Sequence, residues 1–135
     1  MTFSLHPRLA ADCIVIGDFA LSTVLLMNDS RYPWCILVPR RADAREIYQL
    51  NPIDRQQLLD ESCLLAETMT RLYQPDKLNI AAIGNLVPQL HVHHVARFQT
   101  DAAWPAPVWG KLPALAYGND ELVAEVGKLR RGLGF

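Results

Sequence analysis

One stretch of the chain reads Gln89-Leu90-His91-Val92-His93-His94-Val95-Ala96-Arg97 and sets three histidines among apolar residues. Its β-branched valines and its lack of glycine favour a strand. Side chains of a strand alternate between its two faces, so every second residue shares a face. One face is therefore expected to carry Gln89, His91, His93, Val95 and Arg97. The other face is expected to carry Leu90, Val92, His94, Ala96 and Phe98.

This alternation places the imidazoles of His91 and His93 next to each other. Two neutral imidazoles close together can bind a metal ion or act on a phosphate. A structural zinc ion takes four ligands, and the sequence offers no obvious further ligands for this pair. We therefore expect no metal and no cofactor. His94 faces the other way and is interpreted as a hydrogen-bonded residue between sheet and helix or at a dimer edge.

Length and composition indicate one globular domain over residues 1–135. The chain is 50% hydrophobic and 20% charged, which is ordinary for a folded domain. Its formal net charge of −1 gives no electrostatic reason to expect binding to nucleic acid or to a membrane. A phosphate ligand would have to be held by local groups.

The start of the chain and its cysteines predict a cytoplasmic protein. Residues 1–18 lack the apolar core of a signal peptide. No stretch approaches the roughly 20 apolar residues of a membrane span. Cys13, Cys35 and Cys63 are odd in number and lie far apart. We interpret them as reduced, buried thiols.

Apolar runs and turn residues predict an α+β fold. Besides residues 89–97, strands are expected over residues 13–16, 21–27, 34–38 and 78–83, and the second and third of these can form a hairpin. A long helix is expected over residues 52–73 with Asn51 as its cap. The apolar stripe of this helix is expected to pack on the sheet.

Three further segments complete the expected fold. Residues 6–11 are expected to form a short helix or turn, with His6 as a surface or cap residue. Residues 99–113 are rich in proline and are expected to form an ordered loop held by Trp104 and Trp109. A last helix is expected after a cap at Asn119.

With these elements in order, the chain resembles the histidine triad (HIT) family of nucleotide hydrolases and transferases. The family motif is His-φ-His-φ-His-φ-φ, where φ is apolar, often followed by Pro-Arg; residues 89–97 take its place, with Arg97 at the position of the arginine. Upstream, Gly84-Asn85-Leu86-Val87-Pro88 stands where the family has Gly-Gln-Ser/Thr-Val-x. Residues 28–40, which include Asn28 and the run Tyr32-Pro33-Trp34, resemble the family's nucleoside-binding hairpin. The resemblance covers roughly residues 13–109.

The resemblance implies a fold and an assembly. The expected fold is a HIT-like, mainly antiparallel sheet of five strands, with one long helix packed on it and a C-terminal helix. Many members of the family are two-fold dimers. A homodimer is therefore expected here as well, since the apolar, tryptophan-bearing segments would otherwise be exposed.

The resemblance also implies a reaction. His91 takes the position of a nucleophile that attacks the α-phosphate of a nucleotide and forms a nucleotidyl-histidine intermediate. The substrate would be a nucleoside phosphoramidate or a dinucleoside polyphosphate. The main-chain carbonyl of residue 89 could hold the other ring nitrogen of His91, whatever side chain stands there.

Other residues of the expected site bind the nucleotide. His93 and the turn at Gly84 and Asn85 are expected to hold the phosphate, although Asn85 fits a purely structural turn equally well. Asn28 is expected to take the ribose hydroxyls, and Leu26 to flank the base. Arg97 fits either phosphate binding or a structural ion pair.

Two positions depart from the family pattern. Gln89 stands in the place of the first histidine, and Leu86 in the place of a hydroxyl that contacts phosphate in many members. Both changes favour an alternative function, a catalytically weak nucleotide-binding or regulatory protein. The measurement that separates the two functions is release of a mononucleotide from phosphoramidates and dinucleoside polyphosphates.

Overall fold

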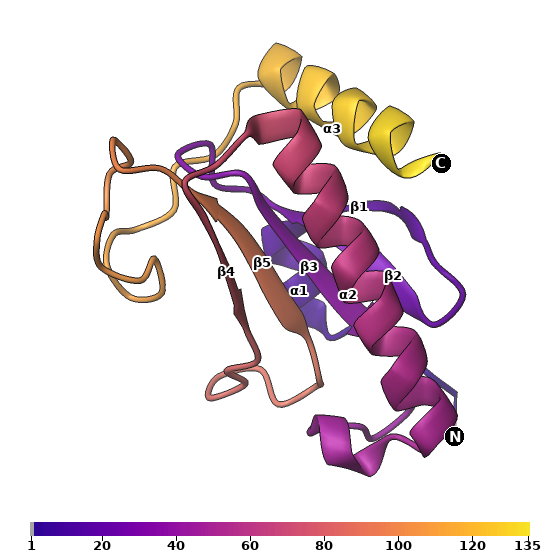
Figure 1. Ribbon diagram of the computed structural model, residues 1–135. Helices are drawn as coiled ribbons and strands as arrows, with labels where there is room; N and C mark the ends of the chain where they lie inside the picture. Colours follow the sequence, from indigo (N-terminus) through magenta and orange to yellow (C-terminus); the bar gives the residue numbers. More distant parts are fainter. Residues whose placement is uncertain (1) are drawn as a thin grey trace.

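A computed structural model describes residues 2–135 as an α+β fold (Figure 1). The elements follow one another as α1 (Pro7–Asp12), β1 (Cys13–Asp18), β2 (Ser22–Met27), β3 (Trp34–Pro39), the 3-10 helix η1 (Ile47–Gln49), α2 (Pro52–Tyr73), β4 (Lys77–Ala81), β5 (Val92–Arg97) and α3 (Asn119–Leu133). The five strands form one sheet in the order β1-β2-β3-β5-β4. All four strand pairs are antiparallel. The expected fold is confirmed. No helix among residues 2–135 is long and apolar enough to cross a membrane.

The two faces of the sheet are covered differently. Helix α2 lies across one face, and α3 packs beside its C-terminal half (Figure 1). Leu58, Leu65 and Met69 of α2 are buried there against the sheet. The other face carries α1, through Leu9, and the long segment after β5, through Ala103 and Val108. Strand β5 is buried along its whole length between these layers.

Helix α2 begins and ends where its sequence predicts. The Asn51 side chain accepts a hydrogen bond from the amide of Asp54 at 2.8 Å, and Pro52 occupies the first turn, where a missing N–H costs nothing. At the other end Gln74 takes a left-handed conformation with φ of 50°. Pro75 follows directly and cannot continue the helix.

Several expected details differ. The structure gives strand β5 from Val92 only, so residues 89–91 lead into it as an extended loop. Helix α3 is capped by Gly118 and not by Asn119, because the side chain of Glu121 accepts a hydrogen bond from the Gly118 amide. All three cysteines are free, but Cys63 lies on the solvent-facing side of α2 and is exposed.

Arg97 organises the segment after β5. Its buried guanidinium donates to both carboxylate oxygens of Asp101, at 2.8 and 3.1 Å. It also donates to the Asn79 side chain and to the carbonyl of Ala106, each at 2.8 Å. Trp104 packs near the guanidinium, so the ion pair and a tryptophan hold the loop together. Arg97 is therefore a structural residue, and the alternative role in phosphate binding is corrected.

Asp101 is the acceptor on which this loop depends. Besides Arg97, it accepts hydrogen bonds from the amides of Phe98, Ala103 and Trp104. Burial alone would raise the pKa of Asp101, but these donors outweigh burial and lower the pKa from 3.8 to about 2. The stability that the carboxylate contributes is thus complete above pH 3.8 and is lost as the pH falls through about 2.

We predict that Asp101→Ala lowers the free energy of unfolding by about 3–5 kcal/mol, because it leaves a buried guanidinium without its partner. Urea unfolding followed by tryptophan fluorescence measures the loss. Asp60→Ala is the matched control, since Asp60 is exposed and bonds only to the side chain of Gln56 among the described residues; it should stay within about 0.5 kcal/mol of the wild type. Equal midpoints for the two variants would contradict this role for Asp101.

Candidate active site

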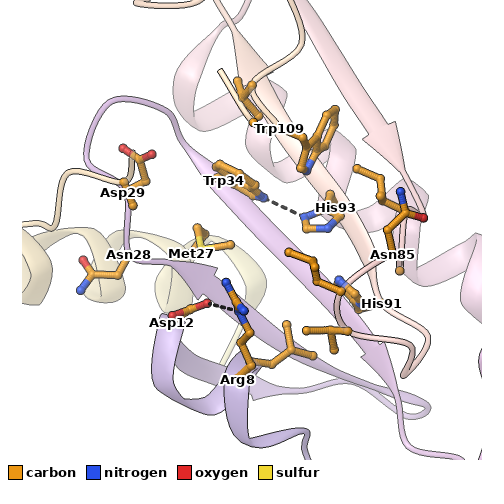
Figure 2. A pocket seen from close by; sticks show the side chains of 18 of the residues that line it. Arg8, Asp12, Met27, Asn28, Asp29, Trp34, Asn85, His91, His93 and Trp109 are labelled. Carbon is orange, nitrogen blue, oxygen red and sulfur yellow. Dashed lines mark hydrogen bonds and ion pairs between the residues drawn. The ribbon is translucent and has the colours of Figure 1, made fainter. Parts of the chain in front are cut away.

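A cavity of about 710 Å³ opens on the face of the sheet opposite α2. Its lining comes from α1, from the end of β2, from β3 and β5, and from the loops before and after β5 (Figure 2). Most of the lining is apolar. The polar side chains that line it are Arg8, Asp12, Asn28, Asp29, Asn85, His91 and His93.

The ring of His91 is held by main chain. His91 is buried directly before β5, and its Nδ1 lies 2.7 Å from the carbonyl oxygen of Gln89. A carbonyl oxygen can only accept, so this contact assigns the proton to Nδ1. In the neutral ring the free lone pair therefore stands on the other nitrogen, Nε2. A neutral imidazole in this state is a nucleophile.

The ring of His93 is held in the opposite sense. The indole Nε1 of Trp34 lies 3.0 Å from Nδ1 of His93 (Figure 2). An indole N–H can only donate, so Nδ1 accepts and the proton of a neutral His93 stands on Nε2. Burial, together with the neighbouring His91 and His94, lowers the pKa of His93 to about 3. His93 is therefore neutral at pH 7 and offers an N–H donor.

The two rings together present unlike atoms to the cavity. Their centroids lie 4.8 Å apart and their planes are inclined at 67°. His91 offers a lone pair and His93 offers a proton-bearing nitrogen. This arrangement suits a ligand with an electrophilic centre and a neighbouring negatively charged oxygen, as in a phosphate ester or anhydride.

His94 lies on the other face of β5, as expected. Its Nδ1 bonds the carbonyl of Val92 at 3.0 Å, and its Nε2 lies 2.7 Å from the hydroxyl of Ser62 on α2. Burial lowers the pKa of His94 to about 4, against the opposing effect of the Val92 carbonyl. His94 is a hydrogen-bonded residue between sheet and helix and does not reach the cavity.

The structure brings five of the eight expected site residues together, and the exceptions are Arg97, Leu26 and Gln89. His91, His93, Asn28, Gly84 and Asn85 all line the cavity. Arg97 does not, since Asp101 binds it. Leu26 is the second correction: its side chain is fully buried in the core on the α2 side of the sheet. The neighbouring residue Met27 faces the cavity instead, because successive side chains of β2 alternate.

The side chain of Gln89 turns away from His93 and holds the N-terminal segment. Its Oε1 accepts a hydrogen bond from the amide of His6 at 2.9 Å, and its Nε2 donates to the carbonyl of Ser4 at 2.8 Å. His6 in turn caps α1, since its Nδ1 accepts from the amide of Arg8 at 3.1 Å. Gln89 therefore supports the site in two ways. Its main-chain carbonyl accepts a hydrogen bond from His91, and its side chain holds the segment that leads into α1.

Three further cavity residues were not expected individually, although Asp29 and Trp34 lie within residues 28–40, the hairpin expected near the nucleoside. Trp34 stands in β3 opposite Val95 and so shares a face with His93. Asp29 accepts hydrogen bonds through Oδ1 from the amide of Arg31 and, at 3.5 Å, of Leu115. Arg8 points from α1 toward the middle of the cavity and pairs with Asp12 at 3.7 Å (Figure 2). These residues reach the cavity because of the register of β3 on β5 and the docking of α1. Local sequence patterns determine neither the register nor the docking.

Within residues 2–135, no three side chains of His, Cys, Asp or Glu gather as a metal ion requires. His91 and His93 are the closest approach to such a site. Their flanking groups are indoles and apolar side chains, and these do not complete a ligand set.

Comparison with known proteins gives consistent relatives. The family model described as "HIT domain" matches residues 8–100. A histidine triad protein from Marinobacter aquaeolei is 50% identical, with 99% of this chain and 98% of that chain covered and a TM-score of 0.97. Histidine triad proteins from Bradyrhizobium japonicum (49% identity, 98% and 99% covered, TM-score 0.96) and Sinorhizobium meliloti (42%, 97% and 97%, 0.94) are also similar. A comparison with curated proteins gives no significant match.

We predict that Gln89→Ala frees the N-terminal segment without releasing His91. The variant loses two hydrogen bonds, worth about 0.5–1.5 kcal/mol each, but keeps the main-chain carbonyl that holds Nδ1 of His91. Hydrogen exchange should therefore become faster at residues 4–6. Gln99→Ala, at an exposed glutamine, is the control and should leave that exchange unchanged. Equal exchange rates in the two variants would show that the side chain of Gln89 does not hold the N-terminal segment.

Proposed function

The chain belongs to the histidine triad (HIT) family, and on that basis we propose that it is a nucleotide hydrolase or nucleotidyltransferase acting at an α-phosphate. The observation that carries this proposal is that Nδ1 of His91 faces an acceptor while Nδ1 of the adjacent His93 faces a donor. A neutral His91 has its free lone pair on Nε2, because its Nδ1 donates to the carbonyl of Gln89. His93 has its proton on Nε2 because its Nδ1 accepts from Trp34.

In the first step, Nε2 of His91 attacks the α-phosphorus of the nucleotide. A P–N bond forms, the bond from phosphorus to the leaving group breaks, and the leaving group keeps the electron pair. The imidazole becomes a cation that retains its Nδ1 proton, and the Gln89 carbonyl stabilises that proton. His93 donates from Nε2 to a non-bridging phosphate oxygen and so stabilises the charge there.

In the second step, water or another acceptor attacks the same phosphorus. The P–N bond breaks, and its electron pair returns to Nε2 of His91. The attacking water loses a proton to solvent, and a nucleoside monophosphate is released. His91 ends in the neutral state in which it began, so the cycle is complete.

The opposite end of the cavity suits the nucleoside. Asp29 is a carboxylate beside the cavity, and a ribose diol needs such an acceptor. The side-chain oxygen of Asn28 accepts a hydrogen bond from the amide of Tyr117. The side-chain amino group of Asn28 remains as a donor. Met27 and Leu9 supply apolar surface for the base. The turn at Gly84, where φ is 71°, presents main chain toward the phosphate end.

A second candidate function is a nucleotide-binding or regulatory protein with little turnover. By the family resemblance, Gln89 replaces a titratable side chain, and here its side chain is bound to Ser4 and His6. Leu86 offers no hydroxyl and is 78% exposed. These two features would weaken catalysis while the cavity remained able to bind a nucleotide.

We also propose that the protein acts in the cytoplasm. Cys13, Cys35 and Cys63 are all free thiols, and none forms a disulfide in the structure. Free thiols persist in reducing compartments.

We predict that His91→Ala abolishes turnover and leaves the fold intact. Rapid quench with radiolabelled nucleotide should trap acid-labile label on the wild type and none on His91→Ala. His93→Ala should lose less, about 10²–10⁴-fold, the usual contribution of one aligned hydrogen-bonding or acid–base group. Unchanged urea midpoints are the control for folding. Unchanged hydrolysis by purified His91→Ala would overturn the mechanism, and a wild type without turnover would favour the binding protein.

We predict a homodimer formed along the free edge of β4. Ile80 on this edge is 49% exposed, and it pairs with His94, which Ser62 of α2 contacts. Leu59 lies one turn before Ser62 on that flank of α2 and is 57% exposed. Together they form an apolar border that a second copy could cover.

Light scattering at micromolar protein should therefore give twice the monomer mass, and Leu59→Asp should shift it toward the monomer. Leu64→Asp is the matched control. Leu64 is also exposed, but it lies one turn after Glu61, which binds the Leu21 and Ser22 amides on the other flank of α2. A monomer mass for the wild type would contradict the prediction.

A further inference from the structure

The environment of His93 holds it in one protonation state. Three rings surround His93, and their centroids lie 5.7 Å (Trp34), 5.4 Å (Trp109) and 4.8 Å (His91) from its own. Among residues 2–135, no carboxylate is hydrogen-bonded to it. A proton on Nδ1 would point at the N–H of Trp34, which already occupies that position as a donor. His93 can therefore donate a hydrogen bond, but it has no second proton to give away.

The other polar groups of the cavity do not supply that proton. The amide of Gln89 does not titrate, and its side chain is bound to the N-terminal segment. Asp12 pairs with Arg8, and Asp29 accepts hydrogen bonds from main-chain amides. Both carboxylates lie across the cavity from His93 (Figure 2). The group that departs from phosphorus must then leave without a proton from the protein.

We propose that Trp34 locks His93 as a neutral hydrogen-bond donor, and that the site consequently selects nucleotides whose leaving group departs as an anion. Phosphoanhydrides are such nucleotides, and phosphoramidates are not. The selection deepens the proposed function and rests on it. Trp34 acts here as a positioning residue, since its hydrogen bond to Nδ1 fixes the tautomer of His93.

The chemistry of the two leaving groups differs in its demand for a proton. When an anhydride is cleaved, the bridging oxygen takes the electron pair of the broken P–O bond and leaves as a phosphate oxyanion. A phosphate monoester has a second pKa near 6, so this anion is stable at neutral pH. When a phosphoramidate is cleaved, the nitrogen takes the electron pair of the P–N bond and must gain a proton to leave as an amine.

Arg8 supplies a positive charge that can stabilise an anionic leaving group. It is the one Lys or Arg among the described residues that line the cavity. Its guanidinium stands across the cavity from His91 (Figure 2). Its side chain is 59% exposed, and its contact with Asp12 at 3.7 Å is longer than a hydrogen bond. Because this contact with Asp12 is loose and exposed, Arg8 can also bind an anionic leaving group, whereas a neutral amine would gain no charge interaction from it.

The lock is tested first on the free protein, without any substrate. Long-range ¹H–¹⁵N spectra of histidine-labelled protein at pH 7 should show His91 protonated on Nδ1 and His93 protonated on Nε2. Trp34→Phe keeps the aromatic ring but removes the donor. In this variant the His93 signals should move toward a mixture of tautomers while those of His91 stay. Wild-type His93 protonated on Nδ1, or on both nitrogens, would overturn the lock even if Trp34→Phe failed to fold.

Trp109→Phe is the matched control for the lock. Trp109 also packs on His93, but its buried Nε1 has no hydrogen-bond partner among the described residues. Its removal should therefore leave the tautomer of His93 unchanged. The same spectral change in both variants would mean that ring packing, and not the donated hydrogen bond, sets the tautomer.

Selection is tested by kcat/KM for diadenosine tetraphosphate and for adenosine 5′-phosphoramidate. The anhydride should react at least about 10²-fold faster, the lower bound of what a positioned acid contributes. Trp34→Phe should lower the ratio of kcat/KM for the anhydride to kcat/KM for the phosphoramidate. Equal rates, or a faster phosphoramidate, would overturn the selection while the proposed function stood. If neither compound reacts, the proposed function and the selection both fail, and the spectra alone decide the lock.

Discussion

Strand β5 lies inside the protein on both of its faces and yet carries polar side chains on each. A buried polar group without a partner costs free energy, so every one of them must be paired. The partners come from three different parts of the chain. Trp34 of β3 bonds His93, Ser62 of α2 bonds His94, and Asp101 of the following loop binds Arg97. These bonds fix the hairpin, the long helix and the loop around one strand.

The candidate site is formed by the ring nitrogens of His91 and His93 that this pairing does not use. Trp34 and the Gln89 carbonyl satisfy one nitrogen of each ring, and the second nitrogen of each faces the cavity. Because one partner donates and the other accepts, the two remaining nitrogens differ in kind. Burial keeps His93 neutral, with its pKa lowered to about 3. The same hydrogen bonds that stabilise the strand therefore also determine on which nitrogen each neutral ring carries its proton.

The sequence allows the prediction of the two faces of β5 and of the start of α2, but not of the cap of α3. The period of two separated His91 and His93 from His94, and Asn51 with Pro52 predicted the start of α2. What it could not provide was the pairing of elements far apart in the chain. The family resemblance predicted Leu26 beside the base, but strand pairing turns its side chain toward α2 and leaves Met27 at the cavity. Trp34 and Arg8 were missed for the same reason, and the side chain of Gln89 binds a segment more than 80 residues away.

The central claim is that the cavity beside His91 and His93 binds a nucleotide in one defined orientation. A crystal structure of the protein with adenosine 5′-monophosphate tests it most directly. The account predicts phosphorus next to Nε2 of His91, a phosphate oxygen on Nε2 of His93, and the ribose against Asp29. A nucleotide bound in the reverse direction, or in the surface groove lined by Tyr73 and Lys128, would contradict it.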